Sequence, residues 1–141
     1  MLEQIPYFMK TKTIRQSVNF SAPPSMIFNL LATSKGHKAF SGCAAKIMPK
    51  VGSKFLVYEG LHGRVLKVEK NKRIVLSWQC DMAGWPKEQY STADFLLKKT
   101  KTGTKIIFTQ TGVPSPSFTD IRDGWKEYYW TPMKEYLANK K

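Results

Sequence analysis

The hydrophobic pattern of this chain changes its period once, near the start of the C-terminal third. Before that point, short segments alternate in two-residue steps, as in Arg73–Cys80, where Ile74, Leu76 and Trp78 fall on one face. A period of two is typical of a half-buried strand, and a period of 3.6 is typical of a helix. The second period begins after Ser117 and is carried by Ile121, Trp125, Tyr129, Met133 and Tyr136. We therefore expect an α+β protein whose sheet packs against one long C-terminal helix.

Turn residues divide the alternating region into separate strands. The dividing groups are Glu59-Gly60, Lys70-Asn71-Lys72 and Lys101-Thr102-Gly103. Strands joined by such short turns pair antiparallel, so we expect a curved antiparallel sheet of about six or seven strands. The predicted strands are Thr13–Phe20, Lys54–Tyr58, Leu61–Glu69, Arg73–Cys80, Tyr90–Lys98 and Thr104–Thr111.

Two short helices are predicted after the first strand. Pro24 suits a first helical turn, because the N–H group that proline lacks would have no partner there. This helix should end near Thr33. Ser34 is expected to cap a second helix that runs to about Phe40 and stops at Gly42.

The long C-terminal helix has a predicted start and a predicted bend. Ser117 followed by Asp120 fits a capping pattern at its N-terminus. Pro132 has no N–H group to donate to the carbonyl of Tyr128, so we expect the helix to bend there.

The length of 141 residues suits one domain with a core of its own. We divide the chain into an N-terminal extension, 1–12, and a single domain, 13–141. No apolar stretch is long enough to span a bilayer, and the first residues lack the features of a secretory signal. We therefore expect a cytoplasmic protein. We also expect a monomer.

Residues with catalytic or metal-binding chemistry are scattered. Cys43 and Cys80 are expected to be buried free thiols, with a disulfide between them as the alternative. His37 and His62 lack the neighbouring ligands of a zinc site. A thiol and base pair of Cys80 with His62 is the alternative to a simple buried thiol. Nucleotide-binding and hydrolase motifs are absent from the sequence, so we expect no enzyme activity, no metal and no cofactor.

The charge is strongly positive, with 23 Lys and Arg against 10 Asp and Glu, a net charge of +13. A field of this sign favours acidic partners. Eight of the bases precede residue 59, where Glu3 is the single acid. Lysines also surround two turns, and we interpret these as solvated residues that block edge pairing. Because no nucleic-acid motif accompanies them, we expect no specific nucleic-acid binding. The turn groups are Lys67, Lys70, Lys72 and Arg73, and Lys98, Lys99, Lys101 and Lys105.

Aromatic residues make up 13% of the chain, and Trp78, Trp125 and Tyr129 can all face the space between sheet and helix. Trp78, Trp125, Tyr129 and Met133 are expected to form packed core there. The alternative is that they form the wall of a cavity for a small apolar ligand. Trp130 falls off the stripe of the helix, so we expect it to be exposed and to serve as a contact anchor.

Eight short motifs resemble, in order, the C-terminal domain of the activator of heat-shock protein 90 (Hsp90) ATPase. The resemblance is collinear from about Thr13 to Leu137. It also implies membership of the START-like (SRPBCC) superfamily with its helix-grip fold. The motifs are Phe40, Val51-Gly52-Ser53-Lys54-Phe55, Glu59-Gly60 with Gly63, Lys72-Arg73-Ile74-Val75-Leu76-Ser77-Trp78, Trp85-Pro86, Tyr90-Ser91-Thr92, Thr111-Gly112-Val113-Pro114 and Gly124-Trp125-Lys126-Glu127-Tyr128-Tyr129-Trp130.

The resemblance implies a co-chaperone that contacts Hsp90 and favours its closed, ATP-hydrolysing state without catalysis of its own. The family's N-terminal domain and its Asn-Asn-Trp-His-Trp motif have no counterpart in these 141 residues. A START-like carrier of a small apolar ligand or lipid is the alternative function. A third possibility is a cyclase-like or hydrolase-like enzyme, for which the sequence offers no acid and base pair. Candidate contacts for the chaperone are Lys35, Lys38, Lys46, Lys50, Lys54 and Trp130.

Overall fold

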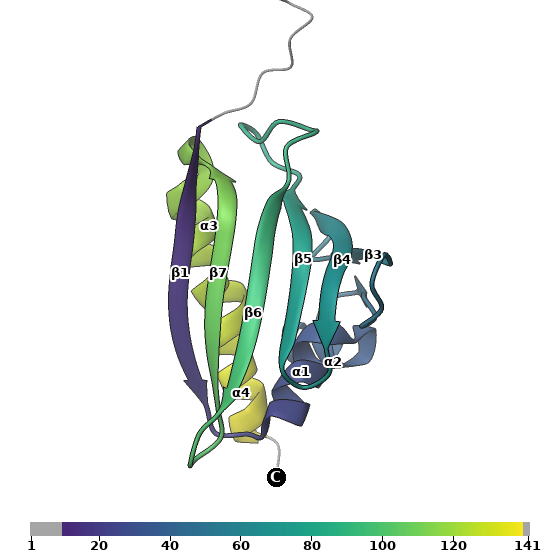
Figure 1. Cartoon of the computed structure of the whole chain (residues 1–141), viewed down its shortest axis with the longest axis vertical. Helices are drawn as coiled ribbons and strands as arrows, with labels where there is room; N and C mark the ends of the chain where they lie inside the picture. The colour runs from purple at the N-terminus through teal and green to yellow at the C-terminus, as the bar shows by residue number, and fades with distance from the viewer. Residues whose placement is uncertain (1–9, 140–141) are drawn as a thin grey trace, which may run out of the picture.

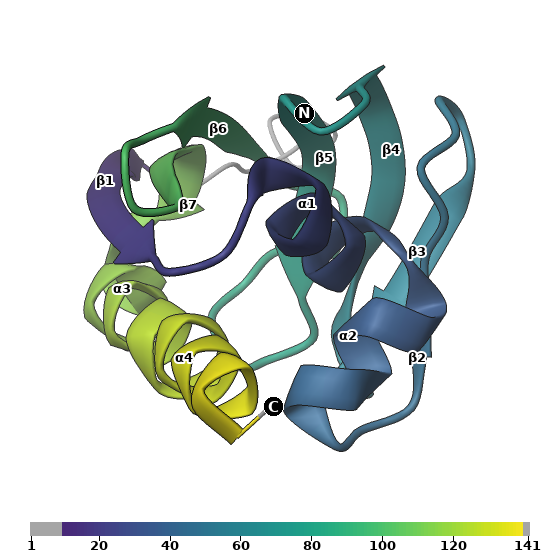
Figure 2. The same ribbon diagram turned by 90° about the horizontal axis from the view of Figure 1, so that it is seen from below.

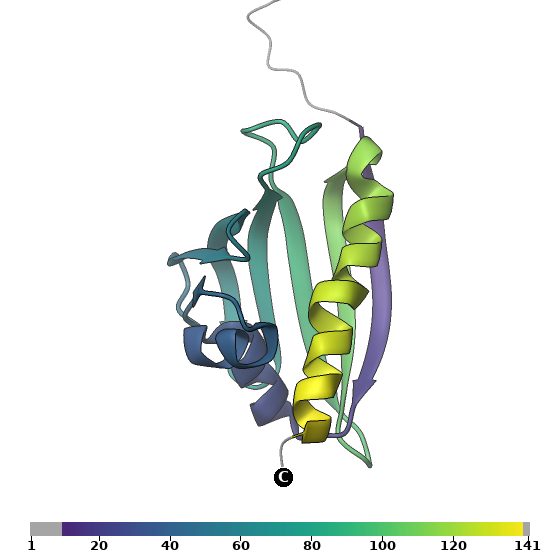
Figure 3. The ribbon, with the colours of Figure 1, turned by 180° about the vertical axis from the view of Figure 1, so that it is seen from behind.

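The computed structural model describes residues 10–139 and folds them into one sheet with every helix on the same face (Figures 1 and 3). The strands pair antiparallel in the order β1-β7-β6-β5-β4-β3-β2. This confirms the α+β helix-grip prediction, including two short helices after the first strand. The strands are β1 (Thr11–Phe20), β2 (Ala45–Lys46), β3 (Lys54–Val57), β4 (Leu61–Glu69), β5 (Arg73–Cys80), β6 (Ser91–Lys99) and β7 (Thr104–Pro114).

Most predicted strands lie within a residue or two of their observed limits, and two exceptions have clear causes. Strand β2 was not predicted, because two residues are too few to show a period. Strand β7 continues past Thr111 because Thr11 and Lys12 pair with Pro114 and Val113. Of the predicted extension, residues 1–9 lie outside the described residues, while Thr11 and Lys12 belong to β1.

Helices α1 (Pro24–Ala32) and α2 (Ser34–Ser41) follow as predicted, but the cap between them differs. Thr33 is the N-cap of α2, and its hydroxyl accepts a hydrogen bond from the Gly36 N–H group. The prediction that Ser34 caps this helix is therefore wrong. The Ser34 hydroxyl instead exchanges two hydrogen bonds with the backbone of Ile47, which attaches α2 to the segment before β3. Gly42 ends α2 in the left-handed conformation, as expected.

The long C-terminal helix contains a π-helical turn in its middle. Helix α3 (Phe118–Trp125) continues through η3 (Lys126–Trp130) into α4 (Thr131–Asn139), and a short 3-10 turn, η2 (Ser115–Ser117), precedes it. Ser117 makes no side-chain cap, so the predicted capping pattern is wrong. The π-helical turn η3 ends two residues before Pro132, which lacks the N–H group needed to continue the backbone hydrogen bonds of the helix.

The helix and sheet close over a core built from alternate strand residues. Phe95 and Phe108 face inward from β6 and β7, with ring centroids 5.0 Å apart. The outer face of the sheet is polar, and Arg73 and Asp94 form a bidentate ion pair across β5 and β6 there. Strands buried on one face need this alternation of apolar and polar residues.

The two cysteines do not form a disulfide. Both cysteines are free, but Cys43 is exposed in the loop after Gly42, so its predicted burial is wrong; Cys80 is half-buried. Within residues 10–139, no helix is both long and apolar enough to cross a membrane.

Candidate functional site

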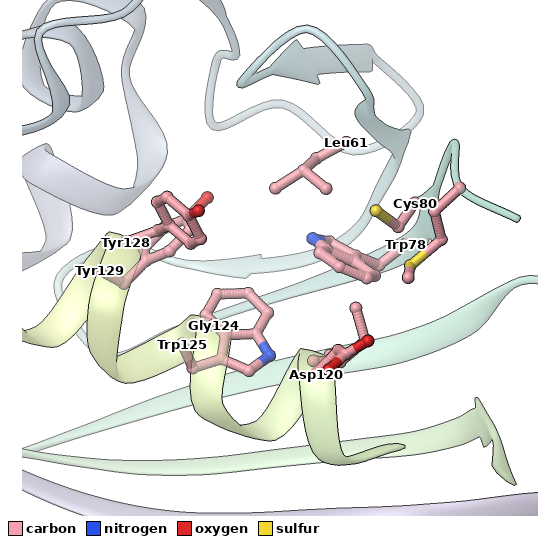
Figure 4. A pocket seen from close by; sticks show the side chains of 10 residues that line it. Leu61, Trp78, Cys80, Asp120, Gly124, Trp125, Tyr128 and Tyr129 are labelled. Atoms are coloured by element: carbon pink, nitrogen blue, oxygen red, sulfur yellow. The ribbon is translucent and has the colours of Figure 1, made fainter. Parts of the chain in front are cut away.

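A pocket of about 210 Å³ opens between the C-terminal helix and strands β4 and β5 (Figure 4). Trp78 on β5 and Trp125 on α3 form facing walls, with ring centroids 5.5 Å apart. Leu61 on β4 lies across from the helix. The pocket is almost wholly apolar, and its ten lining residues are Leu61, Trp78, Cys80, Met82, Asp120, Ile121, Gly124, Trp125, Tyr128 and Tyr129.

A buried chain of hydrogen bonds holds the two tryptophan walls. The Trp125 indole N–H donates to the Gln110 side-chain oxygen at 2.8 Å, and the Gln110 amide donates to the Ser91 hydroxyl at 2.9 Å. Ser91 in turn donates to the backbone carbonyl of Trp78 at 2.8 Å. Gln110 has no exposed surface. The chain therefore connects α3, β7, β6 and β5, and fixes the width of the pocket at this level.

Tyr129 connects the pocket to a buried histidine on α2. Its ring lines the pocket, and its hydroxyl lies 2.8 Å from His37 Nε2. Burial lowers the pKa of His37 from 6.5 to about 4 and raises the pKa of Tyr129 well above its usual value. His37 is therefore neutral at physiological pH.

Tyr58 and Tyr128 lie where the helix ladder is broken by Pro132. The Tyr58 hydroxyl donates to the backbone carbonyl of Tyr128, the group for which Pro132 has no N–H. Desolvation, the largest cause, raises the pKa of Tyr58 to about 12. A side chain from the end of β3 thus takes the place of the missing backbone donor and ties the sheet to the helix.

The titratable groups at the pocket are few. Asp120 lines it from the first turn of α3 and is exposed. Burial, the largest cause, and the neighbouring charge of Asp81 raise the pKa of the Cys80 thiol, which makes its thiolate form scarce. Cys80 reaches the pocket wall, whereas His62 bonds to Tyr90 across 3.5 Å. Within the described ranges, no cluster of three or more His, Cys, Asp or Glu could hold a metal ion. The arrangement suits binding of an apolar molecule better than chemistry upon one.

Three of the four residues predicted for an apolar cavity come together at this pocket. Trp78, Trp125 and Tyr129 line it, whereas Met133 is wholly buried and does not. The other seven lining residues were not predicted, namely Leu61, Cys80, Met82, Asp120, Ile121, Gly124 and Tyr128. Cys80 continues the inward alternation of β5, so that pattern was the signal which could have placed it here.

The five predicted contact lysines are all exposed but fall on two places. Lys46 of β2 and Lys54 of β3 lie on the outer face of the sheet with Leu56, because Lys46 pairs with Leu56, which is two residues from Lys54. Lys50 lies in the connecting loop, and Lys35 and Lys38 lie on α2. We call the surface formed by β2, β3 and their connecting loop the β2–β3 face. It consists of Lys46, Lys54 and Leu56 on the strands and of the exposed residues Met48, Lys50 and Val51 in the loop that connects them.

The three apolar members of the β2–β3 face were not predicted. Met48, Val51 and Leu56 are 53%, 60% and 46% exposed. Exposed apolar side chains with a polar rim are a feature of protein contact sites. The excess of base before residue 59 was the sequence signal for its charged part.

The prediction that Trp130 is exposed is wrong. Only 4% of it is exposed, and its indole N–H donates to the Gln16 side-chain oxygen at 2.7 Å. The cause is the π-helical turn, in which the Thr131 N–H bonds to the Lys126 carbonyl five residues back. Such a turn brings residue 130 close to the face of Trp125, and the two rings stack at 5.8 Å. Trp130 is therefore part of the core and not a contact anchor.

Comparison with known proteins places residues 21–138 in a single family model, described as Activator of Hsp90 ATPase homolog 1-like protein. The human protein named activator of 90 kDa heat shock protein ATPase homolog 1 is 24% identical over 117 residues. That match covers 82% of this chain but 34% of the human protein. The chain thus spans about a third of the length of the curated relatives it matches.

Two solved structures share the fold. An Hsp90 activator from Plasmodium falciparum superimposes with a TM-score of 0.78 at 22% identity, covering 91% of this chain and 96% of that one. DynU16, from the dynemicin biosynthetic locus, superimposes with a TM-score of 0.75 at 17% identity, covering 92% and 48%. At these identities the structures show the fold alone. Because the family model spans more than four fifths of the residues, the chain belongs to the family of Activator of Hsp90 ATPase homolog 1-like proteins.

Proposed function

We propose that this protein is a cytoplasmic co-chaperone that binds Hsp90 and raises its ATPase activity without catalysis of its own. The observation that carries the proposal is the family match over residues 21–138. The net charge of +13 supports it, because a positive field speeds encounter with an acidic protein surface. Titratable groups at the pocket include no paired acid and base, which supports a binding role over a catalytic one.

The proposed mechanism is a shift of population. An activator that binds the closed state of the chaperone more tightly than the open state raises the closed-to-open ratio, at saturation, by the ratio of the two affinities. No group of the activator then needs to reach the ATP. This requires a rigid surface, and Lys46, Lys54 and Leu56 of the β2–β3 face lie on one because β3 pairs with both β2 and β4.

The β2–β3 face is the proposed contact surface. Its lysines would speed association and confer salt dependence, and its apolar residues would supply most of the affinity once desolvated. Reversal of Lys46 and Lys54 to glutamate should therefore slow association, whereas Leu56→Ala should speed dissociation.

A binding experiment tests this assignment. Surface-immobilised Hsp90 from the same source is titrated with the wild-type protein, Lys46→Glu/Lys54→Glu and Leu56→Ala. Lys87→Glu/Lys126→Glu is the matched control, since it makes the same charge change at exposed sites elsewhere. We expect Lys46→Glu/Lys54→Glu to lose about tenfold in affinity and the control to lose at most about twofold. Equal losses in both pairs would refute the β2–β3 face, and no binding by the wild type at low salt would refute the co-chaperone.

The pocket favours a second candidate function, carriage of a small apolar molecule. A dry cavity of about 150 Å³ holds one benzene, so about 210 Å³ suits a single ring or a short aliphatic chain. Native mass spectrometry of the purified protein and titration with toluene, followed through tryptophan indole NMR signals, test this. Cys80→Phe should fill the pocket and abolish binding, while Cys80→Ser should retain it. Undisturbed indole signals in the wild type would exclude the carrier.

A further inference from the structure

Two lysine-rich turns lie at the same end of the sheet, the lower end in Figure 1, where α1 also begins. They are the β4–β5 turn, with Lys70 and Lys72, and the β6–β7 turn, which follows Lys98 and Lys99. A backbone hydrogen bond of 2.7 Å from the Leu97 N–H to the Lys72 carbonyl joins the β4–β5 turn to strand β6, directly before Lys98. The two groups of cations are therefore held at a fixed spacing.

The lysines on β6 and β7 do not lie on an edge strand of the sheet. In the sheet order β1-β7-β6-β5-β4-β3-β2, the outermost strands are β1 and β2, whereas β6 lies between β7 and β5 and β7 lies between β1 and β6. Residues 65–69 of β4, by contrast, have no partner in β3, which pairs with β4 only from Leu61 to Arg64. The interpretation that such lysines block edge pairing therefore does not explain Lys98, Lys99 and Lys105, since it applies to the outermost strands. Lys98 also lies directly opposite Lys105, a like-charge pair that destabilises a hairpin. The cost in stability points to a use for the charge outside the fold.

The lysines line a groove in two adjoining parts. One part, of about 500 Å³, is lined by Lys70, Lys72, Lys98 and Lys99, with Leu96 and Leu97 from β6. The other, of about 460 Å³, runs along α1 past Phe28 and Val68. Lys70 and Asn71 line both parts, so they adjoin at the β4–β5 turn. We call this the lysine groove; Figure 2 views this end of the molecule from below.

The local charge is strongly positive. Glu69 also lines the groove, but it pairs with Lys67 at 3.8 Å and leaves the other lysines uncompensated. The first turn of α1 carries no acidic residue, and its N-terminal end adds a partial positive charge. An anionic occupant would therefore meet cations on both walls.

We propose that the lysine groove binds an acidic, extended peptide segment of a partner protein. A groove in two adjoining parts, with leucine, phenylalanine and valine among its lysines, matches a chain that alternates carboxylates with apolar side chains. Single-stranded nucleic acid would need aromatic platforms for its bases, and the exposed aromatics of the described residues, Tyr90 and Tyr128, line neither part. This surface is separate from the β2–β3 face, and the proposal does not depend on Hsp90 as the partner.

The test uses a short fluorescein-labelled peptide of glutamate and leucine, followed by fluorescence anisotropy with the full chain. We expect saturable binding that weakens as salt is raised. Lys70→Glu/Lys98→Glu should raise the Kd about tenfold, and the matched control Lys87→Glu/Lys126→Glu at most about twofold. Because Lys98→Glu places opposite charges across from each other at Lys105, that variant should fold at least as well as the wild type.

Four results would overturn the proposal. These are no binding of the glutamate peptide, equal binding of a peptide with glutamine in its place, equal weakening by both variant pairs, and tighter binding of an oligothymidine or of anionic vesicles than of the peptide. Equal weakening would mean that only the long-range field attracts the peptide. Tighter binding of the oligothymidine would assign the groove to nucleic acid, and tighter binding of the vesicles would assign it to a membrane surface.

Discussion

Gln110→Met tests whether the buried hydrogen bonds set the geometry of the pocket. Methionine keeps the approximate volume but neither accepts from the Trp125 indole nor donates to Ser91. An unsatisfied buried donor costs about 1–3 kcal/mol, and the lost bond to Ser91 about 1 kcal/mol more. We therefore expect a loss of about 2–4 kcal/mol, or a fall in Tm of roughly 6–12 °C at about 3 °C per kcal/mol.

Urea unfolding followed by tryptophan fluorescence measures this loss, with Thr109→Val on the outer face of the same strand as the control. The control should stay within about 0.5 kcal/mol of the wild type. Trp125→Phe removes the orphaned N–H group, so a double-mutant cycle should give a coupling free energy of at least about 1 kcal/mol. A cost below about 0.5 kcal/mol for Gln110→Met, or additive effects in the cycle, would show that the network is not what holds the tryptophans.

Three further changes test other parts of the structure. The pKa of His37 is about 4 when folded against 6.5 when unfolded, so acid favours unfolding: stability should fall by about 3 kcal/mol between pH 6.5 and 4. His37→Gln should lose that part of the slope in pH-dependent urea titrations. Gly63→Ala would place a Cβ 1.8 Å from the Ser77 carbonyl oxygen, so we expect at least about 1–3 kcal/mol of destabilisation in a thermal melt; an unchanged Tm would contradict the close approach. Gly124→Ala meets only ordinary contact, at 3.7 Å, and should stabilise α3 by roughly 0.5–1 kcal/mol; a lower Tm would contradict this.

The strand and helix pattern was predictable because burial on one face imposes a period. Arg73–Cys80 and Leu61–Glu69 match their strands residue for residue. The prediction of the α2 cap was wrong because two neighbouring residues of similar chemistry compete for that position. Thr33 and Ser34 can both cap a helix. Thr33 does so because the Ser34 hydroxyl is hydrogen-bonded to the backbone of Ile47, 13 residues away.

The site was less predictable because it depends on features that have no period. The side of the helix on which Trp130 lies was set by a π-helical turn that only the assembled helix reveals. The meeting of Trp78 with Trp125 could be foreseen from two separate stripes, but the space left between them depends on the network through Gln110. The purpose of lysines such as Lys98 could not be judged until the sheet order placed β6 in the centre.

The ATP turnover of Hsp90 tests the central claim most directly. It is measured with the chaperone from the same source, with increasing amounts of this protein, and with the turnover that survives an inhibitor of the chaperone's ATP site subtracted. We predict a saturable rise in turnover that is reduced by Lys46→Glu/Lys54→Glu and retained by Lys87→Glu/Lys126→Glu. Unchanged turnover at concentrations that saturate binding would contradict the assignment of this protein as an activator.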